Sequence, residues 1–180
     1  MVTIENKLQK SFIWSGLEKL MKFGLIISGI FVTLITFASV IARAFNFNLL
    51  GYEEILIIFA FWLYMFGSAH GSFENSHIKA DIFVTSMKEG LRKDLITIFR
   101  DMLSVFLGVV FFLWAVQLAK WNLENGQVTP TWRIPMLVSQ SSLLFGLGMG
   151  AFFNTVFLYN KIKRAYFKYI KKMEINETDE

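Results

Sequence analysis

The chain has no cysteine, only two prolines and only two histidines among its 180 residues. The absence of cysteine excludes a disulfide framework, a thiol redox centre and a cysteine-ligated metal site. The two histidines, His70 and His77, lie close together in one segment, whereas haem in a membrane bundle needs histidines on facing helices. Phosphate loops, nucleophile elbows and paired catalytic carboxylates are also missing. We therefore expect no cofactor, no metal and no enzymatic activity.

Charged residues are also scarce within four long apolar blocks of the sequence, where they lie only near the ends. Each block is long enough for the hydrocarbon core of a bilayer, which takes roughly 20 helical residues to cross. Helices suit that environment because they satisfy their own backbone hydrogen bonds. The sequence predicts an all-α integral membrane protein with four transmembrane helices, at about residues 23–44, 54–71, 102–119 and 136–159.

The first block could be mistaken for a signal peptide, because Ala42-Arg43-Ala44 resembles a cleavage site. The apolar stretch from Phe23 to Ala42 is longer than the 7–15 residues typical of a signal sequence. We predict that the first block remains uncleaved.

Two further segments carry apolar residues at helical spacing among lysines and arginines, near residues 4–21 and 80–95. This pattern predicts amphipathic helices at the membrane surface, although a frayed polar tail is the alternative for the first segment. The expected organisation is an interfacial cytoplasmic segment at 1–22, a membrane domain at 23–160 and a basic cytoplasmic tail at 161–180.

The basic residues are distributed unevenly between the blocks. Only Arg43, Lys120 and Arg133 lie on one side of the predicted membrane, and the rest of the 18 lysines and arginines lie on the other. Because cytoplasmic segments are enriched in basic residues, both termini and the middle loop are predicted to be cytoplasmic. The formal net charge of +4 then points to anionic lipid headgroups as partners rather than nucleic acid.

Polar residues cluster at the ends of the predicted spans. Arg43 ends the first span, and Glu53 and Glu54 begin the second on the same side, so an ion pair between Arg43 and Glu53 is geometrically reasonable. Intramembrane charges are candidates for function, but span-end residues favour a structural pair that sets helix depth. His77 and Asp81 share a helical face if that turn is helical, and one histidine with one carboxylate is too few for a metal site.

The segment before the fourth span holds both prolines, in Thr129-Pro130-Thr131-Trp132-Arg133-Ile134-Pro135. Two prolines so close predict a stiff, extended connection just before a helix. The fourth span then contains Gly146-x-x-x-Gly150, a spacing that permits close packing of helices but is common in membrane spans.

These features together resemble the small membrane subunits (DctQ-type) of tripartite ATP-independent periplasmic, or TRAP, transporters. The resemblance covers approximately residues 15–165 and depends on the order of several weak motifs. One departure is Ser139-Gln140-Ser141, which stands where family members often have a further proline. The residues that carry the resemblance, and that we take as candidates for subunit interfaces, are Arg43, Glu53, Glu54, Trp62, His77, Asp81, Pro130 and Pro135.

The resemblance implies two protein partners, a large multi-span permease subunit and a periplasmic substrate-binding protein. It also implies sodium-driven uptake of an organic acid, of the dicarboxylate, keto acid or sialic acid class, across the inner membrane of a bacterium. The small subunit would act as a fixed scaffold. The alternative is a stand-alone four-helix membrane protein, either a homodimeric small exporter or the membrane subunit of a redox complex. An exporter should have a mid-span carboxylate, and a redox subunit should have paired histidines or cysteines.

Overall fold

The chain forms four long helices, seen in a computed structural model that describes residues 12–47, 49–74 and 91–177. Helix α2 spans Phe12–Ala44 and α3 spans Tyr52–Phe73, and α5 spans Leu91–Asn125 and α6 spans Leu137–Glu177. All four are long and apolar enough to cross a membrane. The prediction of an all-α protein with four such helices is confirmed.

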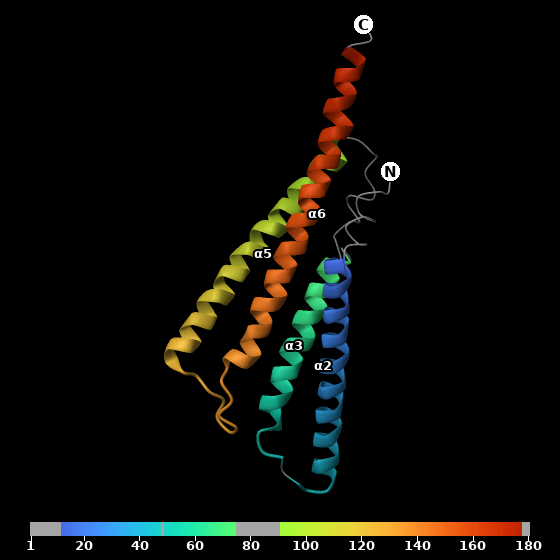
Figure 1. Ribbon diagram of the computed structural model, residues 1–180. Helices are drawn as coiled ribbons and strands as arrows, with labels where there is room; N and C mark the ends of the chain where they lie inside the picture. The colour runs from blue at the N-terminus through green and yellow to red at the C-terminus, as the bar shows by residue number, and fades with distance from the viewer. Residues whose placement is uncertain (1–11, 48, 75–90, 178–180) are drawn as a thin grey trace.

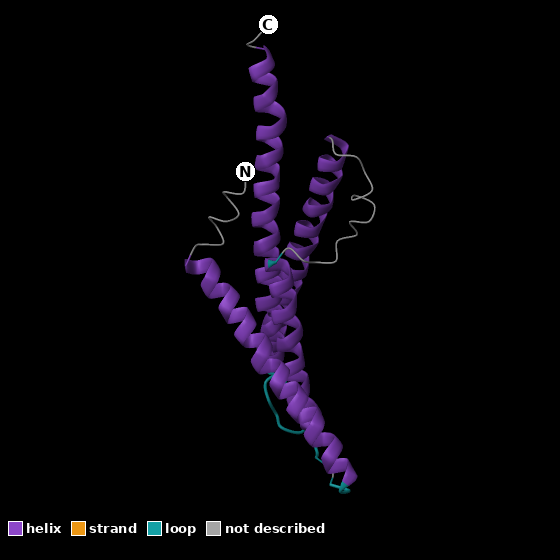
Figure 2. Cartoon of the chain, turned by 90° about the vertical axis from the view of Figure 1, so that its right-hand side faces the viewer, coloured by secondary structure: helices purple, strands orange, loops and turns teal. Residues whose placement is uncertain are grey.

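The helices lie side by side in the order α2, α3, α6, α5 (Figure 1). Within the described part of the chain, backbone contacts join α2 with α3, α3 with α6, and α6 with α5. Each of the two edge helices, α2 and α5, therefore has one neighbour in this row. Figure 2 shows the same helices from the side, where their lower halves overlap in a narrow layer.

The two ends of the molecule differ in character. The loop after α2 and the loop after α5 lie at one end, which we call the loop end. The start of α2 and the end of α6 lie at the other, which we call the terminal end (Figure 1). The longest helix, α6, has 41 residues, which corresponds to about 60 Å at 1.5 Å per residue. Its last turns extend beyond the other helices at the terminal end (Figure 1).

The buried core is small and lies towards the terminal end, where α2, α3 and α6 meet. Trp14 packs against Phe73 and Phe153, with ring centroids 5.4 and 5.2 Å away. Met21 and Ala69 complete the fully or nearly buried cluster. Outside this cluster, large apolar side chains are exposed along both edge helices, including Phe23, Ile30 and Phe37 on α2 and Phe99, Phe106 and Trp114 on α5.

Glycines let α6 approach both of its neighbours. A Cβ atom added at Gly146 would lie 2.8 Å from Met65 Cβ of α3, and one added at Gly148 would lie 3.1 Å from the Phe112 ring of α5. Gly150 faces Ser72 of α3. The Gly146-x-x-x-Gly150 pattern therefore serves packing within the chain, against α3.

The predicted surface segments differ from the structure where residues are described. Residues 12–21, the described part of the predicted segment 4–21, continue into the first span as one helix. Residues 91–95, the described part of the segment 80–95, likewise begin α5. The basic segment after residue 160 continues α6 as far as Glu177. None of these stretches contains a proline, the residue that most strongly interrupts a helix.

Candidate functional site at the loop end

The most organised polar contacts of the molecule lie at the loop end, where α3 begins. The Glu54 carboxylate accepts one hydrogen bond from the Thr131 backbone N–H at 2.7 Å and one from the Trp132 N–H at 2.9 Å. Oε1 accepts the bond from Thr131, and Oε2 accepts the bond from Trp132. A carboxylate that accepts two backbone N–H groups is a strong, charge-assisted contact. Glu54 thus ties the start of α3 to the loop between α5 and α6.

That loop, residues 126–136, has a fixed shape of its own. The Thr129 N–H donates to the Ile134 carbonyl oxygen at 2.9 Å, and the Ile134 N–H donates back to the Thr129 hydroxyl at 3.0 Å. An isolated antiparallel bridge pairs Val128 with Pro135. Arg133 sits at the tip in the left-handed region, with φ of 49°. The chain therefore folds back on itself here, and presents the Thr131 and Trp132 N–H groups to Glu54.

Gly51 completes the contact from the other side. Its φ of 80° lies in the left-handed region that glycine adopts without a Cβ penalty. An added Cβ would also collide with Trp132 Nε1, and it would lie 2.7 Å from Trp132 Cδ1 and 2.8 Å from the Thr131 methyl group. A glycine is therefore required here both for the backbone conformation and for the approach of Trp132. We call Gly51, Glu54, Thr131 and Trp132 the loop clasp.

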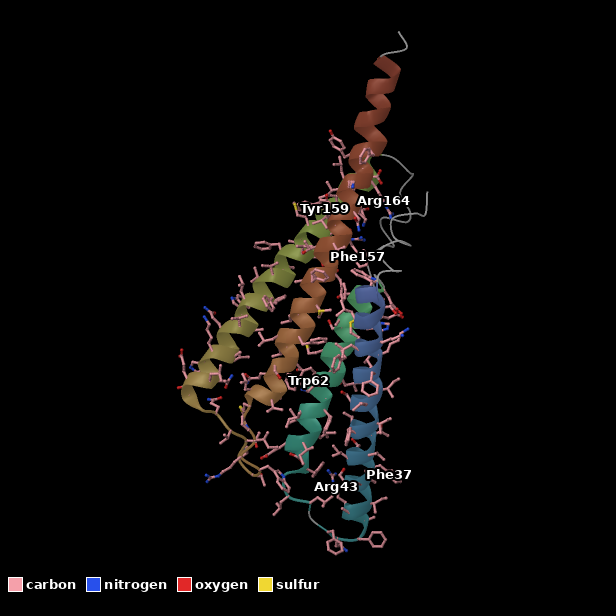
Figure 3. The ribbon with its side chains drawn as sticks, viewed as in Figure 1. Phe37, Arg43, Trp62, Phe157, Tyr159 and Arg164 are labelled. Atoms are coloured by element: carbon pink, nitrogen blue, oxygen red, sulfur yellow. The ribbon has the colours of Figure 1, made fainter. Side chains whose placement is uncertain are left out.

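Arg43, in the last turn of α2, does not pair with Glu53 as the sequence predicted. Its guanidinium donates instead to the Tyr52 hydroxyl, and it lies 6.0 Å from the centroid of the Tyr52 ring. Glu53 is exposed in the first turn of α3. The structure thus gives Arg43 a different partner, the side-chain hydroxyl of the residue that directly precedes the two acids. Figure 3 labels Arg43 near the loop end of the molecule.

Trp62, two to three helical turns beyond Glu54 on α3, also joins α3 to α6. Its indole N–H donates to the Val138 carbonyl oxygen at 3.2 Å. The Trp62 ring also packs against Phe66 and Phe145, with centroid distances of 5.2 and 6.2 Å. Val138 lies in the first turn of α6, so this contact fixes where α6 begins relative to α3 (Figure 3).

The remaining candidates fall into two groups. Pro130 directly precedes the Thr131 N–H that Glu54 accepts, and Pro135 forms the bridge to Val128, so both prolines belong to the folded loop. His77 and Asp81 lie outside the described residues. Among the described residues, no group of histidines and acids could hold a metal ion.

Asn122, whose side chain makes two hydrogen bonds, was missed by the sequence analysis. Asn122 of α5 is 3% exposed, and it donates to the Leu118 carbonyl at 2.9 Å and to the Gln140 side chain of α6. Gln140 lies in the Ser139-Gln140-Ser141 segment at the start of α6. A lone Asn at the end of an apolar block was the available signal, because such residues form interhelical hydrogen bonds in membranes.

Four helices that are long and apolar enough to cross a membrane, with a folded loop between α5 and α6 at one end, define a multi-pass membrane protein. The comparison with known families makes the class specific. The family described as "Tripartite ATP-independent periplasmic transporters, DctQ component" matches residues 32–164. The chain belongs to this family and is a small-subunit component of a TRAP transporter. No curated protein and no solved structure matched the chain.

Proposed function

We propose that the chain is a scaffold subunit that stabilises the large permease subunit of its transporter. The permease would carry the substrate and the sodium ions, and a periplasmic binding protein would deliver the substrate. The substrate class is an organic acid such as a dicarboxylate, a keto acid or a sialic acid. The chain itself performs no catalysis in this proposal.

The observation that carries the proposal is the open, single-row arrangement of the helices. A self-sufficient bundle surrounds a core. Among the described helices, by contrast, the edge helices α2 and α5 each have one neighbour and expose large apolar side chains. Lipid can cover part of that surface, and a second membrane protein can cover the rest by van der Waals packing. The four spans also carry no lysine, arginine, aspartate or glutamate between their ends, and such charges are what a relay for a proton or an anionic substrate would need.

The orientation in the proposal follows the distribution of basic residues. The terminal end, with most of the lysines and arginines, would face the cytoplasm, and the loop end would face the periplasm. The surfaces available to a periplasmic binding protein are then residues 45–53 and 121–135. The second segment exposes two tryptophans, Trp121 at 50% and Trp132 at 57%.

The experiment that tests the proposal compares two neighbouring acids. Glu54→Gln removes the charge that accepts the Thr131 and Trp132 N–H groups, and Glu53→Gln removes the same charge from an exposed neighbour. We would tag each full-length variant in its native membrane, solubilise it gently and quantify the copurifying permease. Substrate uptake by whole cells would be measured in parallel.

We expect wild type and Glu53→Gln to copurify a large permease in roughly equal amounts, and Glu54→Gln to copurify less of it. Substrate affinity of the transporter that remains assembled should not change, because the chain holds no substrate site. Copurification with only a second copy of itself would contradict the scaffold role and favour a stand-alone protein. Full uptake in cells that lack this chain would contradict it as well.

A further inference from the structure

A polar cavity lies between α5 and α6 at the terminal end, far along both helices from the loop clasp. Its volume is about 230 Å³. Its lining combines two cations, one carboxylate, one hydroxyl and two apolar side chains, which are Lys161, Arg164, Asp94, Thr97, Ile98 and Ala165. Figure 3 labels Arg164 on α6, at the level where α5 begins. The cavity therefore joins opposite charges at one end of the membrane-crossing helices.

One wall of the cavity is held in place by Asp101, one helical turn deeper on α5. Arg100 donates to one Asp101 oxygen through Nε at 3.0 Å and Nη2 at 2.8 Å, and the Lys161 ammonium donates to the other oxygen. The Asp101 side chain is only 17% exposed. Asp101 thus holds Lys161 of α6 against α5 at the edge of the cavity.

The surface beside the cavity is apolar and exposed. Leu95, Phe99 and Met102 recur at helical spacing on α5, and Tyr166 lies on α6. Aromatic side chains of this kind are enriched where a bilayer meets water, and tyrosine keeps its hydroxyl in the wet layer. A cation-lined cavity that opens beside such a surface suits a ligand with a phosphate head and acyl chains.

We propose that this cavity binds the headgroup of a membrane phospholipid. The phosphodiester oxygens accept hydrogen bonds from the Arg164 guanidinium and the Lys161 ammonium, as basic pockets between membrane helices do for phosphate headgroups. The Asp94 carboxylate accepts a hydrogen bond from the amine or hydroxyl beyond the phosphate. Phosphatidylethanolamine and phosphatidylglycerol carry such donors, whereas phosphatidylcholine does not. The acyl chains lie along the apolar stripe of α5.

The test measures which lipids remain bound to the full-length chain, together with any protein that copurifies, during stepwise delipidation. Native mass spectrometry would count the lipids after addition of phosphatidylglycerol, phosphatidylethanolamine, phosphatidylcholine or diacylglycerol. Arg164→Gln should weaken retention of phosphatidylglycerol by about tenfold or more, the effect of losing a hydrogen bond to a charged group. Lys163→Gln is the matched control, because it removes the same charge from an exposed neighbour outside the cavity.

Two further variants distinguish lipid binding in the cavity from a general attraction of anionic lipid to positive charge. Ala165→Leu fills the cavity without altering charge, and it should reduce retention of phosphatidylglycerol as Arg164→Gln does, while Arg164→Lys should restore part of it. Circular dichroism of each variant confirms that the helices are intact. Equal losses from Arg164→Gln and Lys163→Gln, or equal retention of diacylglycerol and phosphatidylglycerol, would overturn the proposal. Displacement of the lipid by inorganic phosphate at matched concentration would overturn it too, because the site would then select a free anion.

Discussion

Replacing Gly146 with alanine should weaken the seam between α3 and α6. The added Cβ would lie 2.8 Å from Met65 Cβ and 3.0 Å from the Met65 backbone oxygen. Real Cβ atoms almost never approach other atoms this closely. A backbone oxygen cannot rotate away, so the two helices must separate or tilt to admit the methyl group.

The magnitude follows from a comparison with Gly16, a helical glycine of α2 at which an added Cβ would meet no neighbouring side chain of the described residues within 4 Å. Alanine is better than glycine in a helix by about 1 kcal/mol, and this gain applies to both variants. Overpacking a close contact costs about 1–3 kcal/mol, and this cost applies only at Gly146. The free energies of unfolding of the two variants should therefore differ by about 1–3 kcal/mol, which is roughly 5- to 150-fold in the folding equilibrium.

Unfolding of both full-length variants would be followed by tryptophan fluorescence as a mild detergent is replaced by sodium dodecyl sulfate. Gly16→Ala should be as stable as wild type or more stable, and Gly146→Ala should unfold at a lower fraction of the denaturing detergent. Equal midpoints for the two variants would refute the close approach of α6 to Met65.

Two further variants test the core and the seam. Phe153 is fully buried, and its neighbour Phe152 is 51% exposed. Phe153→Ala should therefore lower the free energy of unfolding by about 3–5 kcal/mol, whereas Phe152→Ala should lower it far less in the same detergent titration. Similar losses for the two variants would contradict the position of the core. Trp62→Phe keeps an aromatic ring but removes the N–H that donates to the Val138 carbonyl oxygen. We expect the free energy of unfolding to fall by about 0.5–1.5 kcal/mol. An unchanged free energy of unfolding would show that this hydrogen bond contributes nothing.

The number and approximate position of the helices could be predicted from the sequence, because charge is absent from exactly the stretches that must enter lipid. The ends of the helices could not. The first turns of α5, from Leu91, and the last turns of α6, up to Glu177, are rich in charged residues. Such stretches resemble surface segments in the sequence, but they contain no residue that interrupts a helix. Hydropathy reports where a helix is apolar and says little about where it stops.

The loop clasp was predicted only in part. Glu54 and the two prolines stood out as an acid at a helix start and a stiff loop, but they are separated by more than 70 residues in the chain. Their meeting depends on the order of the helices in the row, which places the start of α3 beside the start of α6. Arg43 shows the same limit, since the sequence suggested an acidic partner and the hairpin geometry supplied the Tyr52 hydroxyl.

The row of helices also determines how the chain can be inserted into a membrane. Each of the two hairpins, α2 with α3 and α5 with α6, is closed by a short connection and packs along its own length. The two hairpins can therefore insert independently, as in a two-stage view of membrane folding. Only the contact between α3 and α6 then remains to be made, and it is secured by Gly146 near its middle, Trp62 nearer the loops and Glu54 at its end. A defect at this seam would yield two intact hairpins that fail to join, rather than an unfolded chain.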